Sequence, residues 1–345
     1  MHAVVFHGAG KPRWERVGDP KVEHGSDAIV RITTSTIYGT DLHILKGDVP
    51  EVRPGTVLGH EAVGVVEEIG SSVANLKQGD RVLIPAITAD GCCDFCRKGM
   101  YSHCRNGGWV FGHTIHGLQA EYARTPYADT SLYKVPEELT DEQVLFLADI
   151  LPTSYECGVL NGQVKPGDTI AVVGAGPIGL AAVLLSRLYS PGLIMAIDLD
   201  DSRLERARQF GADVTIRSGV ENVVERVMEL TNGAGVDVAM EAVGIPATFE
   251  LCTELVKPGG RVANIGVHGQ PVCLHLERLW SHNITITTRL VDTVSVPQLM
   301  QLIEAGRLDP TVFATHTFPL SDAMAAYDVF SRAAETGALK VVLKQ

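Results

Sequence analysis

The feature that most constrains the fold is a glycine-rich turn between an apolar strand and a helix. Residues 169–173 (TIAVV) read as a buried strand, and the turn Gly174-Ala-Gly-Pro-Ile-Gly179 follows them directly. In this G-x-G-x-x-G spacing Gly174 allows the tight turn, Gly176 lets the backbone approach a phosphate, and Gly179 lets the helix pack on the strand. The segment therefore predicts one strand–turn–helix unit of a parallel sheet.

An acidic residue completes this pattern. Asp198 lies nineteen residues beyond Gly179, at the end of the next predicted strand. A carboxylate there accepts hydrogen bonds from ribose hydroxyls and repels a 2′-phosphate, and the helix N-terminus attracts a pyrophosphate. We expect a dinucleotide site that prefers NAD, although Arg203 in the next turn keeps NADP as an alternative. Further candidate contacts are Pro177, Ile178, Val243 and Gly266. The alternative interpretation is a plain turn with Asp198 as a helix cap.

The rest of the chain has two different patterns. From about residue 151 strand-like and helix-like runs alternate, which is typical of βαβ units. Strands are expected at 169–173, 193–197, 214–216, 236–241, 261–265 and 284–288, and helices at 178–188, 202–210 and 220–230. Before residue 150, short β-type runs at 28–33, 62–69 and 81–85 predict a mostly antiparallel, barrel-like β domain. The tail, with a strand at 340–343, should return to that first domain.

These patterns predict an α/β protein of two domains. One should comprise residues 1–151 and 289–345, and a doubly wound parallel sheet of the Rossmann type should occupy residues 152–288. The formal net charge of -12 makes nucleic acid or an anionic membrane an unsuitable partner. The apolar stretch 169–188 is interrupted by glycines and a proline, which favours a buried strand and helix over a membrane span.

The seven cysteines suggest metal binding in a reducing compartment. Four of them fall between residues 92 and 104, and no secretory signal precedes them, so we expect a cytoplasmic protein. Cys93, Cys96 and Cys104 have the spacing C-x2-C-x7-C, which suits a structural zinc ion. Asp90 and Cys92 both remain open as the fourth ligand, with Asp90 favoured, and a site of plain reduced thiols is the alternative. Cys157, Cys252 and Cys273 are expected to be buried.

A second group of polar residues is a candidate catalytic centre. His60 and Glu61 stand at a turn before the strand at 62–69, and Asp149 lies at the junction of the two predicted domains. Together they would make an N/O ligand set for zinc with an open position, and Asp41 could orient His60. Taken alone, a His-Glu pair in a turn is more often a surface feature. His113, His116, His268 and His282 are better explained as solvated or hydrogen-bonded loop residues than as ligands.

These motifs together resemble the zinc-dependent medium-chain alcohol dehydrogenases. The likeness covers nearly the whole chain and rests on four motifs in order: G-T-D-x-H at 39–43, G-H-E-x2-G at 59–64, the cysteine spacing, and the glycine turn. It implies a GroES-like β-barrel catalytic domain around an inserted Rossmann domain, a dimer or tetramer, and a small alcohol or carbonyl substrate.

The resemblance also implies roles for single residues. His60 would bind a catalytic zinc, with Glu61 behind or on it, and Asp149 falls at a ligand position. Thr40 would bind the substrate oxygen and pass a proton towards His43. Trp109 would form a wall of the substrate pocket, Asp198 would bind the adenosine ribose, and Lys340 would lie near the pyrophosphate.

Tyr38 is the main departure from this family. The family places a cysteine ligand immediately before G-T-D, where this chain has Tyr38, a neutral phenol at ordinary pH. Three cases follow: a zinc held by His60, Glu61 and Asp149, a phenolate ligand, or no catalytic zinc, in which case Tyr38 or Thr40 could donate a proton. The second departure is Asp90 in place of the first cysteine of the structural zinc lobe.

The function we expect is NAD-dependent hydride transfer between a small, secondary alcohol and its carbonyl compound. One alternative is an NAD(P)H reductase of activated carbonyls, imines or enones that lacks the catalytic zinc, because the loss of a thiolate would weaken that site. A second alternative is a dinucleotide-binding protein without activity. The presence of Thr40, His43, His60 and Asp149 in one chain argues against this last alternative.

Overall fold

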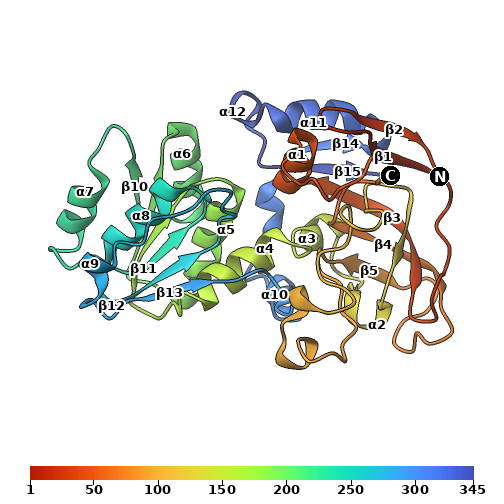
Figure 1. Ribbon diagram of the computed structural model, residues 1–345, viewed down its shortest axis with the longest axis horizontal. Coiled ribbons are helices and arrows are strands. Elements are labelled where there is room, and N and C mark those ends of the chain that lie inside the picture. Colours follow the sequence, from red (N-terminus) through yellow and green to blue (C-terminus); the bar gives the residue numbers. More distant parts are fainter. The chain divides into compact units, whose positions relative to one another are not determined.

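The structure is a computed structural model that describes residues 1–345, and the chain divides into two compact units (Figure 1). Unit 1 consists of Met1–Asp149 and Asp292–Gln345, and unit 2 of Ile150–Val291. The predicted boundaries at 151 and 289 therefore lie two and three residues from those of the structure. The C-terminal tail belongs to unit 1, as the sequence indicated.

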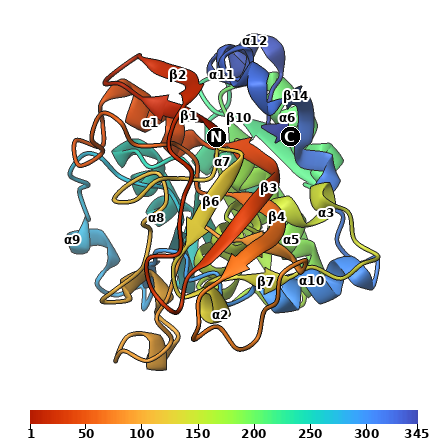
Figure 2. The same ribbon diagram turned by 90° about the vertical axis from the view of Figure 1, so that its right-hand side faces the viewer.

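Unit 1 is built on a seven-stranded, mostly antiparallel sheet. Its order is β14-β15-β3-β4-β5-β7, and β6 pairs with the N-terminal part of β3, residues 28–31. Figure 2 shows β3 and β4 beside β6. The strands are β3 (Ala28–Ile37), β4 (Ala62–Ile69), β5 (Arg81–Ile84), β6 (Tyr122–Thr125), β7 (Tyr133–Lys134), β14 (Ala314–Pro319) and β15 (Lys340–Lys344). A separate antiparallel pair is formed by β1 (His2–Phe6) and β2 (Pro12–Arg16). The mostly antiparallel β domain that the sequence predicted is confirmed.

The tail is fastened to unit 1 by strand pairing. β15 runs antiparallel to β3, and Val341 pairs with Ile37. Figures 1 and 2 both show the N- and C-termini close together on this unit. Its helices are α1 (Gly39–Lys46), α2 (Ala128–Ser131), α3 (Asp141–Leu145), α10 (Val296–Glu304), α11 (Ala323–Ser331) and α12 (Ala333–Thr336). Buried residues of α1, α11 and β15 share one apolar core with Val4 and Phe6 of β1.

Unit 2 is a six-stranded parallel sheet in the order β10-β9-β8-β11-β12-β13. Its strands are β8 (Thr169–Val173), β9 (Leu193–Asp198), β10 (Val214–Arg217), β11 (Val236–Glu241), β12 (Val256–Asn264) and β13 (Thr285–Thr288). Its helices are α4 (Ile150–Thr153), α5 (Pro177–Ser186), α6 (Asp201–Phe210), α7 (Val223–Leu230), α8 (Pro246–Leu255) and α9 (Leu276–Leu279), and a π-helical segment spans Ser154–Leu160. Apolar residues of the sheet pack on those of α7 and α8 in one core.

Local chemistry explains where the elements of unit 2 begin. Helix α7 starts at Val223 rather than at the expected residue 220, because the side chain of Asn222 accepts a hydrogen bond from the N–H of Glu225. Helix α6 starts after Asp200, whose carboxylate accepts from two N–H groups of the first turn. Strand β12 begins five residues before the predicted start at 261, in a segment where its pairing with β11 is irregular. The predicted strands at 169–173 and 236–241 have the bounds expected.

The prediction that three cysteines outside the lobe are buried is confirmed for two of them. Cys157 and Cys252 are buried as predicted, but Cys273 is exposed, in the irregular segment that precedes α9. The prediction for Cys273 was wrong because no strand or helix carries it into the core.

Across the whole chain, no helix combines the length and the apolar character needed to cross a bilayer.

Gly64 should be required for the stability of unit 1. It lies where β4 pairs with β3, and a Cβ there would overlap the carbonyl oxygen of Arg31 and come within 2.6 Å of Val30 Cγ1. We expect Gly64→Ala to lower the free energy of unfolding by about 2 kcal/mol, because two strands would have to separate to admit the methyl group. Gly18→Ala is the control, since its Cβ would meet no atom within 4 Å. Urea denaturation measures both, and equal midpoints would contradict the packing argument.

Candidate active site

Predicted catalytic residues from separate parts of unit 1 gather around His60. His60 and Glu61 directly precede β4, Tyr38 caps the N-terminus of α1, and Asp149 ends the first segment of the unit. His60 Nε2 lies 3.3 Å from Asp149 Oδ2, and the side chains are 3% and 11% exposed. The rings of Tyr38 and Trp109 meet the imidazole edge-on, with centroid distances of 5.2 and 6.4 Å. The predicted site residues are thus brought together by tertiary structure.

Lys340 lies inside this cluster. Its ammonium group donates to Glu61 Oε2, and both side chains are 1% exposed. The same nitrogen lies 4.5 Å from the centroid of the Tyr38 ring, a cation–π contact. Strand register explains the placement: Val341 pairs with Ile37, which sets their neighbours Lys340 and Tyr38 side by side. Because the ammonium is already paired with Glu61, a contact of Lys340 with a cofactor pyrophosphate remains a prediction.

Burial and neighbouring charges shift the ionisation of the cluster. Burial alone lowers the pKa of His60, but the hydrogen bond to Asp149 and the charges of Asp41, Asp149 and Glu61 outweigh it, so the pKa is raised. Burial raises the pKa of Glu61, and the charge of Lys340 opposes that shift. Burial likewise raises the pKa of Asp41 against the charge of His60. The cluster therefore holds protons more tightly than exposed side chains would.

Asp41, which we expected to orient His60, supports the cluster from α1 through hydrogen bonds to other residues. Its Oδ2 accepts from the N–H of Tyr38 at 2.9 Å and from the amide of Gln119 at 3.1 Å. The other oxygen is buried and has no hydrogen-bond partner, so Asp41 acts on His60 through its charge. The hydroxyl of Tyr327 donates to Gln119 Oε1 at 2.7 Å. Sequence reasoning missed Gln119 and Tyr327, which lie 208 positions apart and carry no motif.

The two predicted proton-transfer residues lie on α1. Thr40 is half-buried in the first turn, and His43 follows three positions later, which places both on neighbouring parts of the helix surface. The side chain of His43 is 61% exposed, and its Nδ1 lies 2.8 Å from Asp48 Oδ2. His43 thus stands at the solvent side of the segment that begins with Tyr38.

The donor set around His60 fits a zinc ion only in part. The 3.3 Å between His60 Nε2 and Asp149 Oδ2 suits two ligands of one tetrahedral ion. Glu61 Oε1 is buried without a hydrogen-bond partner, yet the other oxygen of Glu61 binds Lys340. His60, Glu61 and Asp149 are not among the groups whose ligand atoms all lie within 4.8 Å of one another. The fit therefore rests on two residues, and a third would require Glu61 to move.

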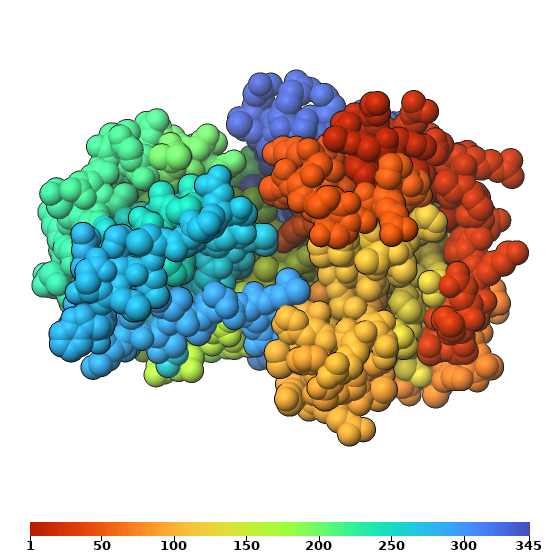
Figure 3. Space-filling view, viewed as in Figure 1, coloured from red at the N-terminus to blue at the C-terminus, as the bar shows by residue number.

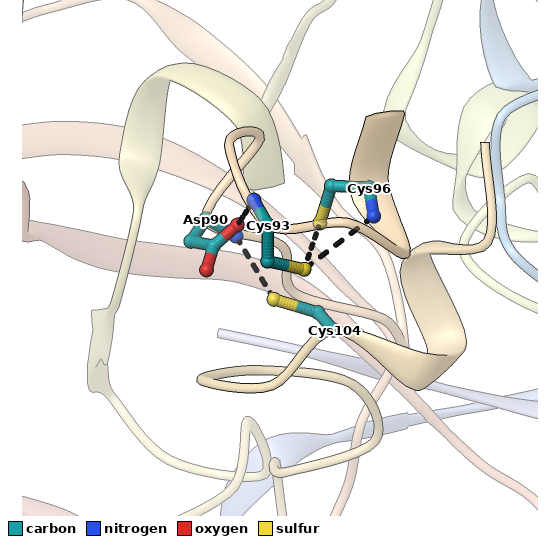
Figure 4. Close-up of side chains that lie close together, drawn as sticks. All are labelled: Asp90, Cys93, Cys96 and Cys104. Carbon is teal, nitrogen blue, oxygen red and sulfur yellow. Dashed lines mark hydrogen bonds between the residues drawn. The ribbon is translucent and has the colours of Figure 1, made fainter. Parts of the chain in front are cut away.

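The cysteine lobe, defined as residues 86–117, contains a complete ligand set. Figure 3 shows this part of unit 1 as a gold projection, and Figure 4 shows the side chains of Asp90, Cys93, Cys96 and Cys104 turned towards one another. Their ligand atoms all lie within 4.8 Å of one another, and Cys93 Sγ is 3.5 Å from Cys96 Sγ. Four donors with no open position fit a structural zinc ion. Cys92 is exposed and outside this group.

Backbone N–H groups donate hydrogen bonds to the sulfur and carboxylate atoms of the lobe. The N–H of Asp90 donates to Cys104 Sγ at 3.2 Å, and that of Cys96 to Cys93 Sγ at 3.4 Å. The pKa of Cys93 is lowered by backbone hydrogen bonds, first from Arg105 and then from Cys96, whereas burial raises the pKa of the Cys96 thiol. The Asp90 carboxylate accepts from the N–H groups of Cys92 and Cys93 and from Asn106, which holds it beside the thiols.

The predicted dinucleotide motif of unit 2 has the expected geometry. Gly174 has a φ of +102°, and a Cβ there would lie 2.6 Å from Val243 Cγ2. A Cβ on Gly179 would overlap the carbonyl oxygen of Gly174, whereas one on Gly176, the N-cap of α5, would meet nothing within 4 Å. The turn is therefore closed by Gly174 and Gly179, and the space at Gly176 is left for a ligand at the helix N-terminus.

Asp198 borders this turn at the end of β9. Its Oδ2 accepts the N–H of Ala175 at 2.7 Å, its Oδ1 that of Asp200 at 3.0 Å, and Arg203 Nη1 lies 3.9 Å from Oδ2. In the strand order, β9 and β10 follow β8 towards one edge of the sheet, whereas β11, β12 and β13 follow it towards the other. Ligands of open parallel sheets bind in the crevice outside such a switch point. The glycine turn and Asp198 lie at this edge.

Zinc content will identify the fourth ligand of the cysteine lobe. We expect Cys104→Ser to lose the ion of this lobe and to lower the unfolding temperature, because a closed zinc site contributes folding free energy. Cys92→Ser should keep both the metal and the stability of the parent, since Asp90 completes the set. Elemental analysis and thermal unfolding measure the outcome. Loss of one zinc per chain in Cys92→Ser would assign the ligand to Cys92 instead.

The buried pair of Lys340 and Glu61 should be essential to the stability of unit 1. Lys340→Met leaves the carboxylate of Glu61 buried without its cation, and we expect a loss of about 3 kcal/mol in the free energy of unfolding. The double variant with Glu61→Gln should recover part of this loss, because the unpaired charge is gone. Denaturant unfolding of both variants checks the coupling, and strictly additive losses would show that the two groups do not interact.

Comparison with known proteins assigns the family. Residues 24–137 match the alcohol dehydrogenase GroES-like domain, and residues 177–305 match the zinc-binding dehydrogenase family. An alcohol dehydrogenase of Cupriavidus necator is 40% identical over 100% of this chain and 98% of its own length. The NADP-dependent isopropanol dehydrogenase of Thermoanaerobacter brockii is 33% identical over 85% of each. The apo structure of zinc dependent alcohol dehydrogenase 2 from Streptococcus pneumoniae has a TM-score of 0.95 and 48% identity, covering 100% of this chain and 98% of that one. The chain therefore belongs to the zinc-binding alcohol dehydrogenase family, as an oxidoreductase of the alcohol dehydrogenase type.

Proposed function

We propose that the chain is an NAD-dependent dehydrogenase that interconverts a small secondary alcohol and its ketone. The observation that carries this proposal is the closed glycine turn of unit 2, with open space at Gly176 and with Asp198 hydrogen-bonded to the N–H of Ala175. This arrangement offers N–H groups to a pyrophosphate and a carboxylate to a ribose. A nicotinamide held by this unit would accept hydride from the carbinol carbon.

The charge at the ribose position favours NAD over NADP. Asp198 is held by two backbone N–H groups, so its carboxylate stays fixed where a 2′-phosphate would be repelled. Arg203 is half-exposed near Asp198 and is the residue that supports the NADP alternative. The Thermoanaerobacter brockii relative is named as NADP-dependent, so membership of the family does not by itself decide between NAD and NADP.

Unit 1 would hold the alcohol and remove its proton. We assign substrate contact to Thr40, and to Trp109 as an apolar wall beside His60. Thr40 would accept the hydroxyl proton while releasing its own, and the exposed imidazole of His43 would pass a proton on to solvent. His60 and Asp149 would hold a catalytic zinc, which Glu61 could join only after leaving Lys340. Such an ion would supply Lewis-acid polarisation of the substrate oxygen.

A second candidate function is reduction of activated carbonyls, imines or enones without a catalytic zinc. The observation that favours it is the ammonium of Lys340, which already neutralises Glu61 and lies over the ring of Tyr38. A cation so close to the ligand positions lowers the affinity of the cluster for a second cation. The structural zinc of the cysteine lobe is common to both functions.

We also propose a homo-oligomer, either a dimer or a tetramer, in a reducing, cytoplasmic setting. Unit 2 exposes an apolar patch at the edge of its sheet, where β13 pairs on one side only. Leu276 and Trp280 of this patch are 59% and 79% exposed. Patches of this kind mark protein contacts, and an unpaired strand edge needs cover. Free thiols as zinc ligands are stable where thiols stay reduced.

The two candidate functions differ in zinc content and in the effect of replacing Tyr38. If the alcohol dehydrogenase proposal holds, the protein oxidises 2-propanol with NAD faster than with NADP and contains about two zinc ions per chain. About one ion, with reduction of activated carbonyls but little alcohol oxidation, would favour the second candidate. In that case Tyr38→Cys should raise both zinc content and alcohol oxidation. Tight NADH binding with no turnover of either substrate class would contradict both.

A further inference from the structure

A buried acidic residue stands at the ligand edge of the parallel sheet in unit 2. Glu241 is the last residue of β11, and its side chain is 0% exposed. In the sheet register it pairs with Val173, the last residue of β8, and with Asn264, the last residue of β12. Glu241 therefore lies at the switch point where a dinucleotide would bind, but beneath the surface.

One oxygen of Glu241 organises the turn that follows β11. Oε1 accepts from the N–H of Val243 at 2.9 Å, the N–H of Gly244 at 2.8 Å and the hydroxyl of Thr248 at 2.7 Å. Three donors on one oxygen fix the conformation of residues 242–244. The other oxygen, Oε2, is buried without a hydrogen bond and lies 3.3 Å from His268 Nε2.

His268 joins this carboxylate to the loop that follows β12. Asn264 donates its amide to the carbonyl of Gly266 at 2.9 Å, so its Oδ1 must accept, and that oxygen lies 2.8 Å from His268 Nε2. His268 Nε2 therefore carries a proton between two acceptors, Asn264 Oδ1 and Glu241 Oε2. His268 Nδ1 is buried and has no partner. The loop of residues 265–268 is thus tied to Glu241 by the imidazole.

The turns that follow β11 and β12 pack tightly against each other. A Cβ on Gly266 would overlap Glu241 Oε2, and one on Gly244 would overlap the carbonyl oxygen of Val267. Val243 in turn packs against Gly174 of the glycine turn, within 2.6 Å of where a Cβ would stand. The turns after β8, β11 and β12 therefore form one continuous surface, and its shape depends on the buried pair.

We propose that Glu241 and His268 are positioning residues that shape the cofactor site for the nicotinamide-ribose half of the dinucleotide. This inference rests on the proposed function, since it presupposes dinucleotide binding. Asp198 and β9 lie to one side of the glycine turn and take the adenosine, so the other half must extend over the ends of β11 and β12. Neither residue touches the reacting atoms; each acts through the backbone it holds.

Variants of His268 separate a positioning role from a general structural one. His268→Leu removes the hydrogen bond to Asn264 Oδ1 and the ring nitrogen that faces Glu241 Oε2. His268→Gln can place an amide N–H in the same position. We expect His268→Leu to raise the Kd of NADH and the KM of NAD about tenfold, the size of one lost hydrogen bond, while kcat stays within about twofold. His268→Gln should recover most of the affinity. His24→Leu, at an exposed position in unit 1, is the matched control.

The outcomes are read by NADH fluorescence titration, steady-state kinetics and thermal unfolding. Unchanged Kd and KM in His268→Leu would overturn the inference, and so would equal losses in His268→Leu and His268→Gln with a common drop in unfolding temperature. Glu241→Gln gives an independent check, because its amide would face His268 with a donor, and its Kd should rise as well. Failure of the parent protein to bind NADH or NADPH would refute the proposed function itself.

Discussion

The pairing of β15 with β3 decides which side chains meet in unit 1. It joins the last strand of the chain to a strand more than 300 positions earlier and sets Lys340 beside Tyr38 and Glu61. A slip of one residue would turn Lys340 to the opposite face, because side chains alternate along a strand. The ammonium of Lys340 and the carboxylate of Glu61 can be buried only because they are paired with each other. The strand register is therefore needed for this pair, and the pair in turn favours the register.

The same buried charges affect what the cluster can bind. Glu61 compensates Lys340, and this leaves His60 and Asp149, 3.3 Å apart, as the closest pair of candidate metal ligands. In the cysteine lobe three thiols and a carboxylate converge, and none of the four donors is taken up by a buried lysine. The two candidate sites thus differ physically: one brings four donor atoms together, and the other shares its carboxylate with a lysine.

Much of the fold was predictable because its signals are local. Short apolar, β-type runs predicted the bounds of β4, β8 and β11, and the glycine spacing placed the turn at Gly174. The cysteine spacing picked out Cys93, Cys96 and Cys104, whose sulfur atoms lie close to one another and to a carboxylate oxygen of Asp90. Helix starts were less accurate, as at α7, because a single capping side chain decides them. The burial of Cys273 was mispredicted, since composition does not tell which loops are covered.

The sequence by itself determined the order of the elements, the class of the two units and the residue types available for chemistry. Only the tertiary structure decided that Gln119 and Tyr327 hold Asp41, that Lys340 neutralises Glu61, and that His268 meets Glu241. The physical reason is the distance along the chain over which each kind of interaction acts. Propensity and glycine spacing act within a few residues, whereas hydrogen bonds between buried polar groups depend on strand register and packing between segments far apart in the chain.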